Sequence, residues 1–433
     1  MSAAVVTDYA PEPSLAQSGT LYASSSAAIA PLSAVLTALA LGLTQLIAIR
    51  GWADRHDLRG ALMQWDSLWM TNIAEHGYLG FSIGDEPIRW QSVAFFPGYP
   101  TLVRIVASPM TIFGVHDATY IAAVIVSTAS CVALAAGLAV LALQLWRRLP
   151  DSVRLPPPTT RAQVCVAVAV TVLAFGAPMS VIYWMPYSES LFTASAVWAL
   201  VLVLRRQYLA AGLLVLVAGL TRLTASALVL TLCAVAVVEL WQWARRRTEF
   251  PVAAVLAPII GSAGIGGYLL WADATVADIG GYFAAQDRGW GSGFDWGSST
   301  LDWLANNLAL DVGDATGLGL GLSSWSMILV AGLIAVSLWP LLGRWLPWPV
   351  WLTATTVALI VLGSGGIMHS RPRLLLLPTL LLMIPFVVRA TRWASRQSYP
   401  WLWVILGVEI GGLWCGFGFW VSGHMLIDFD YGI

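Results

Sequence analysis

Long uninterrupted apolar runs constrain this chain more than any other feature. Of its 433 residues, 58% are hydrophobic and 10% are charged, whereas a soluble protein carries about a quarter charged residues. Several runs reach the roughly 20 residues that a helix needs to cross a bilayer. The period-2 alternation of an outer-membrane barrel is absent from the sequence. The sequence therefore predicts an all-α polytopic membrane protein.

The apolar runs predict about 9 to 12 membrane helices. The run 208–243 is too long for one ordinary span, and Gly219, Thr221 and Arg222 interrupt it, so we expect a helical hairpin or a broken helix. We interpret 96–113 as an interfacial or re-entrant piece buried against protein, because irregular backbone at membrane depth is tolerated in that setting. The other predicted spans are about 28–49, 119–146, 162–184, 190–204, 250–271, 323–343, 347–366, 374–388 and 399–421.

Arginines in short loops and at span ends orient the predicted helices. Because basic residues favour the cytoplasmic side, we place these loops in the cytoplasm and the loops 50–118 and 272–322 outside. A full crossing by 96–113 would move the first arginine-rich loop outside, against this bias. The orienting residues are Arg147, Arg148, Arg154, Arg161, Arg205, Arg206, Arg245, Arg246, Arg247, Arg344, Arg389, Arg392 and Arg396.

Acidic residues concentrate on the side of the predicted membrane opposite to these arginines. Acids hardly influence topology, so their excess indicates a water-facing working surface outside the cell. Residues 1–27 are small, polar and proline-containing, which is typical of a disordered tail, here a cytoplasmic one. We expect a single integral domain, 28–433, to lie in the plasma membrane as a multi-pass protein with its active site on the external (periplasmic) side.

The first external loop, 50–118, carries the strongest functional signal. Its residues 61–79 place apolar and aromatic side chains at i, i+3 and i+4 spacings, which predicts an amphipathic interfacial helix with Trp65 and Trp69 at headgroup level. Asp66 follows Trp65 directly. A carboxylate at a membrane surface is well placed to meet a lipid-borne substrate, although a capping or solvating aspartate is the alternative reading.

Four motifs follow one another along the chain. They are WDSLWMTNIAEHGYLG with AFFPGYP, then APMSVIYWMPYSESLF, then AGLLVLVAGLTRLTASAL, and more faintly SRPRLLLLP. This series resembles the PIG-V type (GPI mannosyltransferase 2-like) mannosyltransferases, which add the second mannose in GPI-anchor assembly and have bacterial relatives. The chain departs from that pattern at Trp69-Met70, where an aromatic pair is frequent, and at Arg371-Pro372-Arg373, where Arg-Tyr is usual. The loop 272–322 does not align.

The resemblance implies an inverting GT-C type glycosyltransferase that takes a sugar, with mannose expected, from a polyprenyl-phosphate donor. The acceptor would be the hydroxyl of a lipid-linked glycan or lipoglycan at the outer face, and Asp66 would be the catalytic base. Membrane lipids, polyprenyl-phosphate-mannose and the lipid-linked acceptor are the expected partners, with no nucleic acid. No metal-ligand constellation stands out and no cofactor is certain, so any requirement for a divalent metal stays open.

Further candidate residues lie on the predicted external side or within an apolar run. The FFPGYP elbow has two prolines that fix backbone turns. For binding the donor phosphate, the candidates are Arg222, His369, Arg371 and Arg373. For contacts to sugar or acceptor, they are Trp65, His76, Tyr78, Glu86, Tyr187, Glu189 and Arg288.

Each of these residues also has a purely structural reading. Arg222 within an apolar run would be costly unpaired, so a structural salt bridge competes with phosphate binding. Glu189 after Ser188 fits the start of a helix, where an acid is favourable. Arg371 and Arg373 would anchor the interface, and His76 would pack there. Glu86 would sit in a solvated turn, Arg288 lies in a Gly-rich loop, and Glu409 has no clear partner.

A secondary transporter, or a flippase for lipid or polyprenyl phosphate, is the alternative reading. A transporter places ionisable residues at mid-membrane in broken helices, whereas nearly all carboxylates of this chain lie in predicted external segments. The chain also has no internal repeat of the kind that builds many transporters. A protein of the same fold that has lost catalysis stays open as well.

Overall fold

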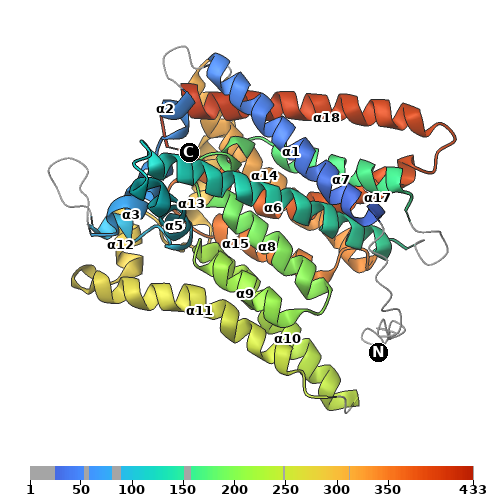
Figure 1. Cartoon of the computed structure of the whole chain (residues 1–433), viewed down its shortest axis with the longest axis horizontal. Helices are drawn as coiled ribbons and strands as arrows, with labels where there is room; N and C mark the ends of the chain where they lie inside the picture. Colours follow the sequence, from blue (N-terminus) through green and yellow to red (C-terminus); the bar gives the residue numbers. More distant parts are fainter. Residues whose placement is uncertain are drawn as a thin grey trace.

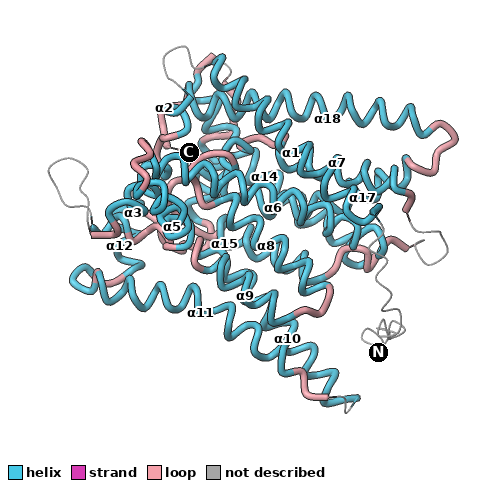
Figure 2. The backbone as a smooth tube through the Cα atoms, in the orientation of Figure 1, coloured by secondary structure: helices cyan, strands magenta, loops and turns pink. Residues whose placement is uncertain are grey.

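The computed structural model describes residues 25–52, 58–79, 89–150, 158–246, 249–311 and 313–432. All regular structure in these ranges is helical (Figure 1 and Figure 2), which confirms the predicted all-α class. An isolated bridge between Phe294 and Ser364 is the one extended pairing among them. The predicted tail up to residue 24 and the candidate Glu86 lie outside the described residues.

Seven of the described helices are long and apolar enough to cross a membrane, and four shorter apolar helices lie between them. The chain is therefore a multi-pass membrane protein, as predicted. The seven are α1 (Ser25–Trp52), α6 (Ala118–Arg148), α10 (Ser226–Arg246), α11 (Val252–Thr275), α14 (Ala315–Leu342), α17 (Leu376–Ala394) and α18 (Pro400–Gly423). The shorter four are α7 (Thr160–Phe175), α8 (Glu189–Leu204), α9 (Tyr208–Gly219) and α15 (Trp348–Leu362).

The long run 208–243 is broken in its middle, as predicted. Helix α9 ends at Gly219, Arg222 is extended with φ −157° and ψ 146°, and a 3-10 turn at Leu223–Ala225 leads into α10. Helix α11 then packs tightly along α9. At Gly212 a Cβ atom would lie 2.8 Å from the carbonyl oxygen of Ala257, so glycine permits this close approach.

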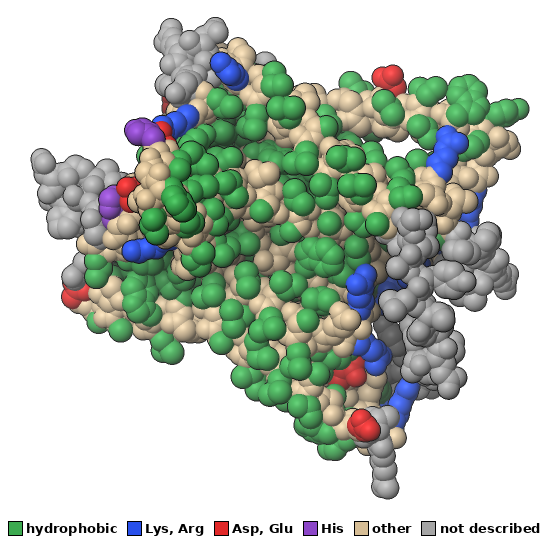
Figure 3. Space-filling view, in the orientation of Figure 1, with side chains coloured by type: hydrophobic (Ala, Val, Ile, Leu, Met, Phe, Trp, Pro, Cys, Tyr) green, Lys and Arg blue, Asp and Glu red, His purple; other side chains and the backbone are tan. Residues whose placement is uncertain are grey.

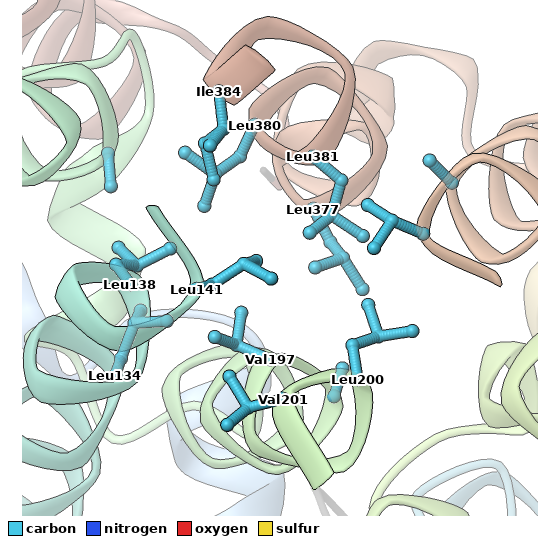
Figure 4. Packing of buried hydrophobic residues seen from close by; sticks show 14 of the residues in the cluster. Leu134, Leu138, Leu141, Val197, Leu200, Val201, Leu377, Leu380, Leu381 and Ile384 are labelled. Atoms are coloured by element: carbon cyan, nitrogen blue, oxygen red, sulfur yellow. The ribbon is translucent and has the colours of Figure 1, made fainter. Parts of the chain in front are cut away.

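The core lies where α6, α8 and α17 meet, and Figure 4 shows their side chains facing one another. Helix α8 is apolar on all sides and buries most of its length, which is typical of a central helix. Lipid is as apolar as leucine, so close packing rather than escape from water holds these helices together. The facing residues are Leu134, Leu138 and Leu141 on α6, Val197, Leu200 and Val201 on α8, and Leu377, Leu380, Leu381 and Ile384 on α17.

Short helices gather at one end of the bundle (Figure 1). The two predicted external loops meet there, since Gln286 Nε2 donates to the carbonyl of Ala94, and near the end of α11 the hydroxyl of Tyr268 donates to the carbonyl of Val93. The predicted 96–113 piece forms a 15-residue helix that packs on α3 and α6 and is not among the candidate spans. These helices are α2 (Leu58–Leu62), α3 (Asp66–His76), α4 (Arg89–Ser92), α5 (Gly98–Ile112), α12 (Tyr282–Trp290) and α13 (Ser298–Asn306).

The predicted interfacial helix 61–79 differs from the structure. The chain forms α2 up to Leu62, turns, and begins α3 at Asp66. Trp65 causes the break, because its φ of 48° lies in the left-handed region that non-glycine residues rarely adopt. Gly77, with φ 77°, ends α3 after His76.

Figure 3 shows hydrophobic side chains over the middle of the molecule and several basic side chains gathered at the end away from α3 and α12. Arg205 and Arg206 after α8, and Arg245 and Arg246 at the end of α10, are exposed there. The predicted orientation depends on these arginines lying together at one end of the molecule, which would be the cytoplasmic end. The end that carries α3 would then face outward.

Cysteine accessibility tests this orientation. We expect His116→Cys, between α5 and α6, to react in intact cells with a membrane-impermeant maleimide, because its side chain is 94% exposed. We expect Ser395→Cys, an exposed position after α17, to react after lysis alone. Both variants require a background without the four native cysteines. The opposite labelling pattern would reverse the orientation.

Candidate active site

Asp66 is the first residue of α3 and lies beside the segment that precedes α8. The backbone N–H of Asp66 donates to the hydroxyl of Tyr187 (3.3 Å), and that hydroxyl donates to the carbonyl of Gln64 (3.4 Å). Tyr187 is fully buried. The strained turn at Trp65 and the Tyr187 hydroxyl together fix where the carboxylate of Asp66 points.

Glu189, the first residue of α8, pairs with Arg222 at the break between α9 and α10. Nη1 of Arg222 lies 2.5 Å from Oε1 of Glu189 and donates to the hydroxyl of Ser188 (3.4 Å). Glu189 is 5% exposed. Ser188 makes no side-chain cap of α8, so its hydroxyl serves Arg222 rather than the helix. Arg222 therefore makes the salt bridge that was the structural alternative to phosphate binding. Whether Arg222 also binds phosphate stays a prediction.

Arg373 lies between the two carboxylates. It belongs to the four-residue helix α16 (Arg371–Leu374), and its Nη1 lies 2.7 Å from Oδ2 of Asp66 while its Nε lies 3.8 Å from Oε1 of Glu189. The guanidinium also stands over the ring of Tyr187, 5.3 Å from its centroid. Its side chain is 9% exposed. Asp66, Arg373, Glu189 and Arg222 thus form a row of alternating charges.

The surroundings shift the pKa values of this row. Burial raises the pKa of the Asp66 carboxyl above its ordinary value, and the charge of Arg373 opposes that shift. Burial alone would lower the pKa of Arg373, but Asp66 and Glu189 outweigh it and raise that pKa, so Arg373 stays a cation. A carboxylate with a raised pKa is a stronger base than a free aspartate, which suits proton abstraction.

The FFPGYP elbow packs against the break between α9 and α10 that carries Arg222. The N–H of Gly98 donates to the carbonyl of Leu220 (2.5 Å), so the start of α5 rests on the break that carries Arg222. A Cβ at Gly98 would lie 2.7 Å from that oxygen, which is why a glycine stands here. The hydroxyl of Tyr99 bonds to Ser127 (2.8 Å), and Ser127 donates to the carbonyl of Met185 (2.7 Å).

Two cavities adjoin the charged row. A small cavity of about 20 Å³ has room for about one water, and we name it the polar cavity after the charged side chains of Glu189, Arg222 and Arg373 in its wall, which also includes Phe192 and three leucines. A larger apolar groove of about 170 Å³ runs between α7, α14, α17 and α18. Tyr183 and Leu376 line both cavities, so one wall separates the charged groups from the groove.

Two candidates near Arg373 have other partners. Arg371 donates to the carbonyls of Val361, Ser364 and Gly365 and is 3% exposed, so it caps the end of α15 rather than facing the charged row. Burial lowers the pKa of Arg371 to about 10. His369 packs against the rings of Phe429 and Tyr431, 5.8 and 5.3 Å between centroids, and burial lowers its pKa.

The remaining candidates lie apart from the charged row, except Trp65, which precedes Asp66 and contacts Gly432. Tyr78 donates to the carbonyl of Phe95 (2.7 Å) and packs near Tyr268 and Trp271. His76 and Arg288 are exposed. Among the residues described, no three His, Cys, Asp or Glu side chains form a group that could hold a metal ion.

Sequence reasoning missed three residues at the site. Tyr183 and Thr193 line the polar cavity from the segment around α8, and Thr224 lines it from the break before α10. Tyr183 stands in the APMSVIYWMPYSESLF motif that carried part of the family resemblance. The motif could therefore have indicated Tyr183 as a site residue, whereas nothing in the sequence indicates Thr193 or Thr224.

Similarity to known proteins is low. No family model matches the chain, and no curated protein matches it. Among solved structures, the chain is similar to the crystal structure of ArnT from Cupriavidus metallidurans bound to undecaprenyl phosphate, with 14% identity and a TM-score of 0.48 over 89% of this chain and 69% of that chain. A match at this level carries no inference about the chemistry of this chain.

The charged row predicts a clear response to neutralising one member. Glu189→Gln leaves Arg222 and Arg373, whose side chains are 19% and 9% exposed, with Asp66 as their nearby carboxylate, so we expect it to destabilise the protein by about 3 kcal/mol. Adding Arg222→Gln should restore part of the loss, because the double variant removes a whole pair. Thermal unfolding in detergent measures both, with exposed Glu75→Gln as the control. An unchanged midpoint for Glu189→Gln would contradict this account.

Proposed function

We propose that this chain is an inverting membrane glycosyltransferase of GT-C type that moves a sugar from a polyprenyl-phosphate donor to an acceptor hydroxyl. The observation that carries the proposal is a largely shielded carboxylate, Asp66, in contact with Arg373, which lines a small cavity that shares Tyr183 and Leu376 with an apolar groove. Asp66 would take the proton of the acceptor, the arginines would hold the phosphate of the donor, and the groove would hold its hydrocarbon chain. The motif resemblance to PIG-V type enzymes favours mannose as the sugar.

The adjoining cavities favour an amphiphilic donor. A polyprenyl-phosphate sugar has a charged phosphate at the end of a long hydrocarbon chain. Arg222 and Arg373 line the polar cavity, which at about 20 Å³ has to widen to admit the phosphate, and the groove beyond Tyr183 and Leu376 offers an apolar surface to the chain. Arginine suits phosphate because its planar fork donates two parallel hydrogen bonds. An ordinary soluble sugar nucleotide would have no use for the groove.

The proposed reaction is a single displacement. Asp66 accepts the proton of the acceptor hydroxyl, whose oxygen attacks the anomeric carbon while the bond from that carbon to the phosphate oxygen breaks. The phosphate leaves with the bonding electrons, so it needs positive charge rather than an acid, and Arg373 with Arg222 supplies that charge. The new bond forms on the face opposite to the one that breaks, which inverts the anomeric centre.

The placement of the site favours a lipid-linked or lipoglycan acceptor at the outer face of the plasma membrane. Asp66 begins α3, at the end of the bundle where the two predicted external loops meet. A lipid-borne acceptor would present its hydroxyl at this depth. The alternative, a transporter or flippase for polyprenyl phosphate, would share the groove but would not require Asp66 for sugar transfer.

Substitution of Asp66 tests the proposal. We expect Asp66→Ala and Asp66→Asn to lower sugar transfer by a factor on the order of 10³, the loss typical of a missing general base. The assay uses purified protein reconstituted in lipid membranes. It offers three labelled donors, the polyprenyl phosphates of mannose, glucose and arabinose, and we expect transfer from the mannose donor. Asp117→Asn is the matched control, since Asp117 pairs with Arg59 (2.7 Å) at the same end but away from the row. Undiminished transfer by both Asp66 variants would refute the base.

The groove makes a separate prediction. Ser326 on α14 lines the groove, so Ser326→Phe should fill part of it and raise the KM for a long-chain donor by about tenfold, as expected for a lost apolar subsite. A donor with a chain of two isoprene units should be little affected. Ala335→Phe, on an exposed face of the same helix, is the control. Equal effects on both donors would place the chain elsewhere.

A further inference from the structure

Arg373 has two carboxylate neighbours and holds them unequally. Its contact with Asp66 is short, 2.7 Å, and its contact with Glu189 is longer, 3.8 Å. Glu189 has its own close cation in Arg222, at 2.5 Å. Arg373 is therefore needed for charge balance chiefly at Asp66, and Glu189 keeps a cation whether or not Arg373 moves.

The hydrogen bonding of Arg373 is also incomplete. Its Nη1 atom has Oδ2 of Asp66 at 2.7 Å, whereas its buried Nε atom has no hydrogen-bond partner among the described residues and only the distant Oε1 of Glu189 at 3.8 Å. Buried donors of this kind are costly unless an acceptor reaches them. The polar cavity that these groups line is the space from which an acceptor would reach them.

The resting contact works against the role of Asp66 as base, because the charge of Arg373 opposes the rise that burial causes in the pKa of Asp66. A carboxylate in a 2.7 Å ion pair with a guanidinium holds its negative charge tightly and is a weaker base than the same carboxylate without that partner. An incoming acceptor hydroxyl would also compete with Arg373 for the oxygen of Asp66. The pair must loosen before proton abstraction.

We propose that Arg373 is exchanged between Asp66 and the donor phosphate, so that donor binding releases the base. This inference rests on the proposed function. The phosphate replaces one anion of Arg373 by another, so the buried cation stays paired throughout. Glu189, anchored by Arg222, is a positioning residue that keeps the guanidinium within reach of both anions. The acceptor then meets a free Asp66 once a donor is in place, which protects the resting site from acting on an acceptor alone.

The exchange has a consequence that a static phosphate clamp does not share. If Asp66 and phosphate compete for Arg373, removing the charge of Asp66 should strengthen phosphate binding while it abolishes transfer. We expect Asp66→Asn to bind undecaprenyl phosphate in lipid nanodiscs about fivefold more tightly than the unsubstituted protein, the size of a modest ion-pair term. Asp117→Asn, the control, should bind it as the unsubstituted protein does.

A double-variant cycle separates exchange from simple repulsion between Asp66 and the phosphate. In a background of Arg373→Gln, Asp66→Asn should no longer tighten binding, because the shared cation is gone. Equal tightening in both backgrounds would overturn the exchange, and so would unchanged or weaker binding by Asp66→Asn alone. Asp66→Ser repeats the test with a smaller side chain, and thermal unfolding confirms that each variant is folded.

The two proposals fail in different ways. If the unsubstituted protein neither binds undecaprenyl phosphate nor transfers sugar from a polyprenyl-phosphate donor, the proposed function is wrong. If Asp66→Asn transfers sugar normally, the transferase stands and Asp66 is not its base. If the protein binds the lipid and requires Asp66 for transfer, but binding by Asp66→Asn is no tighter, the function stands and the exchange is wrong.

Discussion

A row of four alternating charges, inside a membrane protein with 58% hydrophobic residues, is the constraint on which the end that carries α3 depends. Asp66, Arg373, Glu189 and Arg222 are linked by contacts of 2.7, 3.8 and 2.5 Å. Any of these charges alone would be expensive at this depth. Because each is balanced by its neighbours, the segments that carry them are favoured to assemble together.

The fold brings these segments to one point by interrupting its helices there. Helix α8 begins at Glu189, the α9–α10 run breaks at Arg222, and the four-residue helix α16 carries Arg373. The FFPGYP elbow locks onto the same break through Gly98 and Leu220. Irregular backbone is tolerated at such depth when protein surrounds it. The same breaks bring Glu189, Arg222 and Arg373 to a small cavity that shares Tyr183 and Leu376 with the apolar groove.

Much of this could be predicted from the sequence. The length of the apolar runs predicted the helices, and Arg222 in the middle of a run predicted the break. The motifs named all four members of the row, yet not their pairing, because residues as far apart as 66 and 373 carry no signal of contact in a single sequence. Arg371 and Arg373 looked equivalent, but positions two apart on a helix face different ways, so one caps α15 and the other meets Asp66.

The break before α3 was hidden for a different reason. The apolar pattern of 61–79 fits a continuous helix, and the left-handed φ of Trp65 depends on packing that no local pattern encodes.

A structure with undecaprenyl phosphate bound tests the central claim most directly. The account predicts the phosphate oxygens within about 4 Å of the Arg373 guanidinium, the Asp66 carboxylate released from that arginine, and the hydrocarbon chain along the groove between α14 and α18. A lipid bound elsewhere, or a phosphate beside an intact Asp66–Arg373 pair, would contradict it.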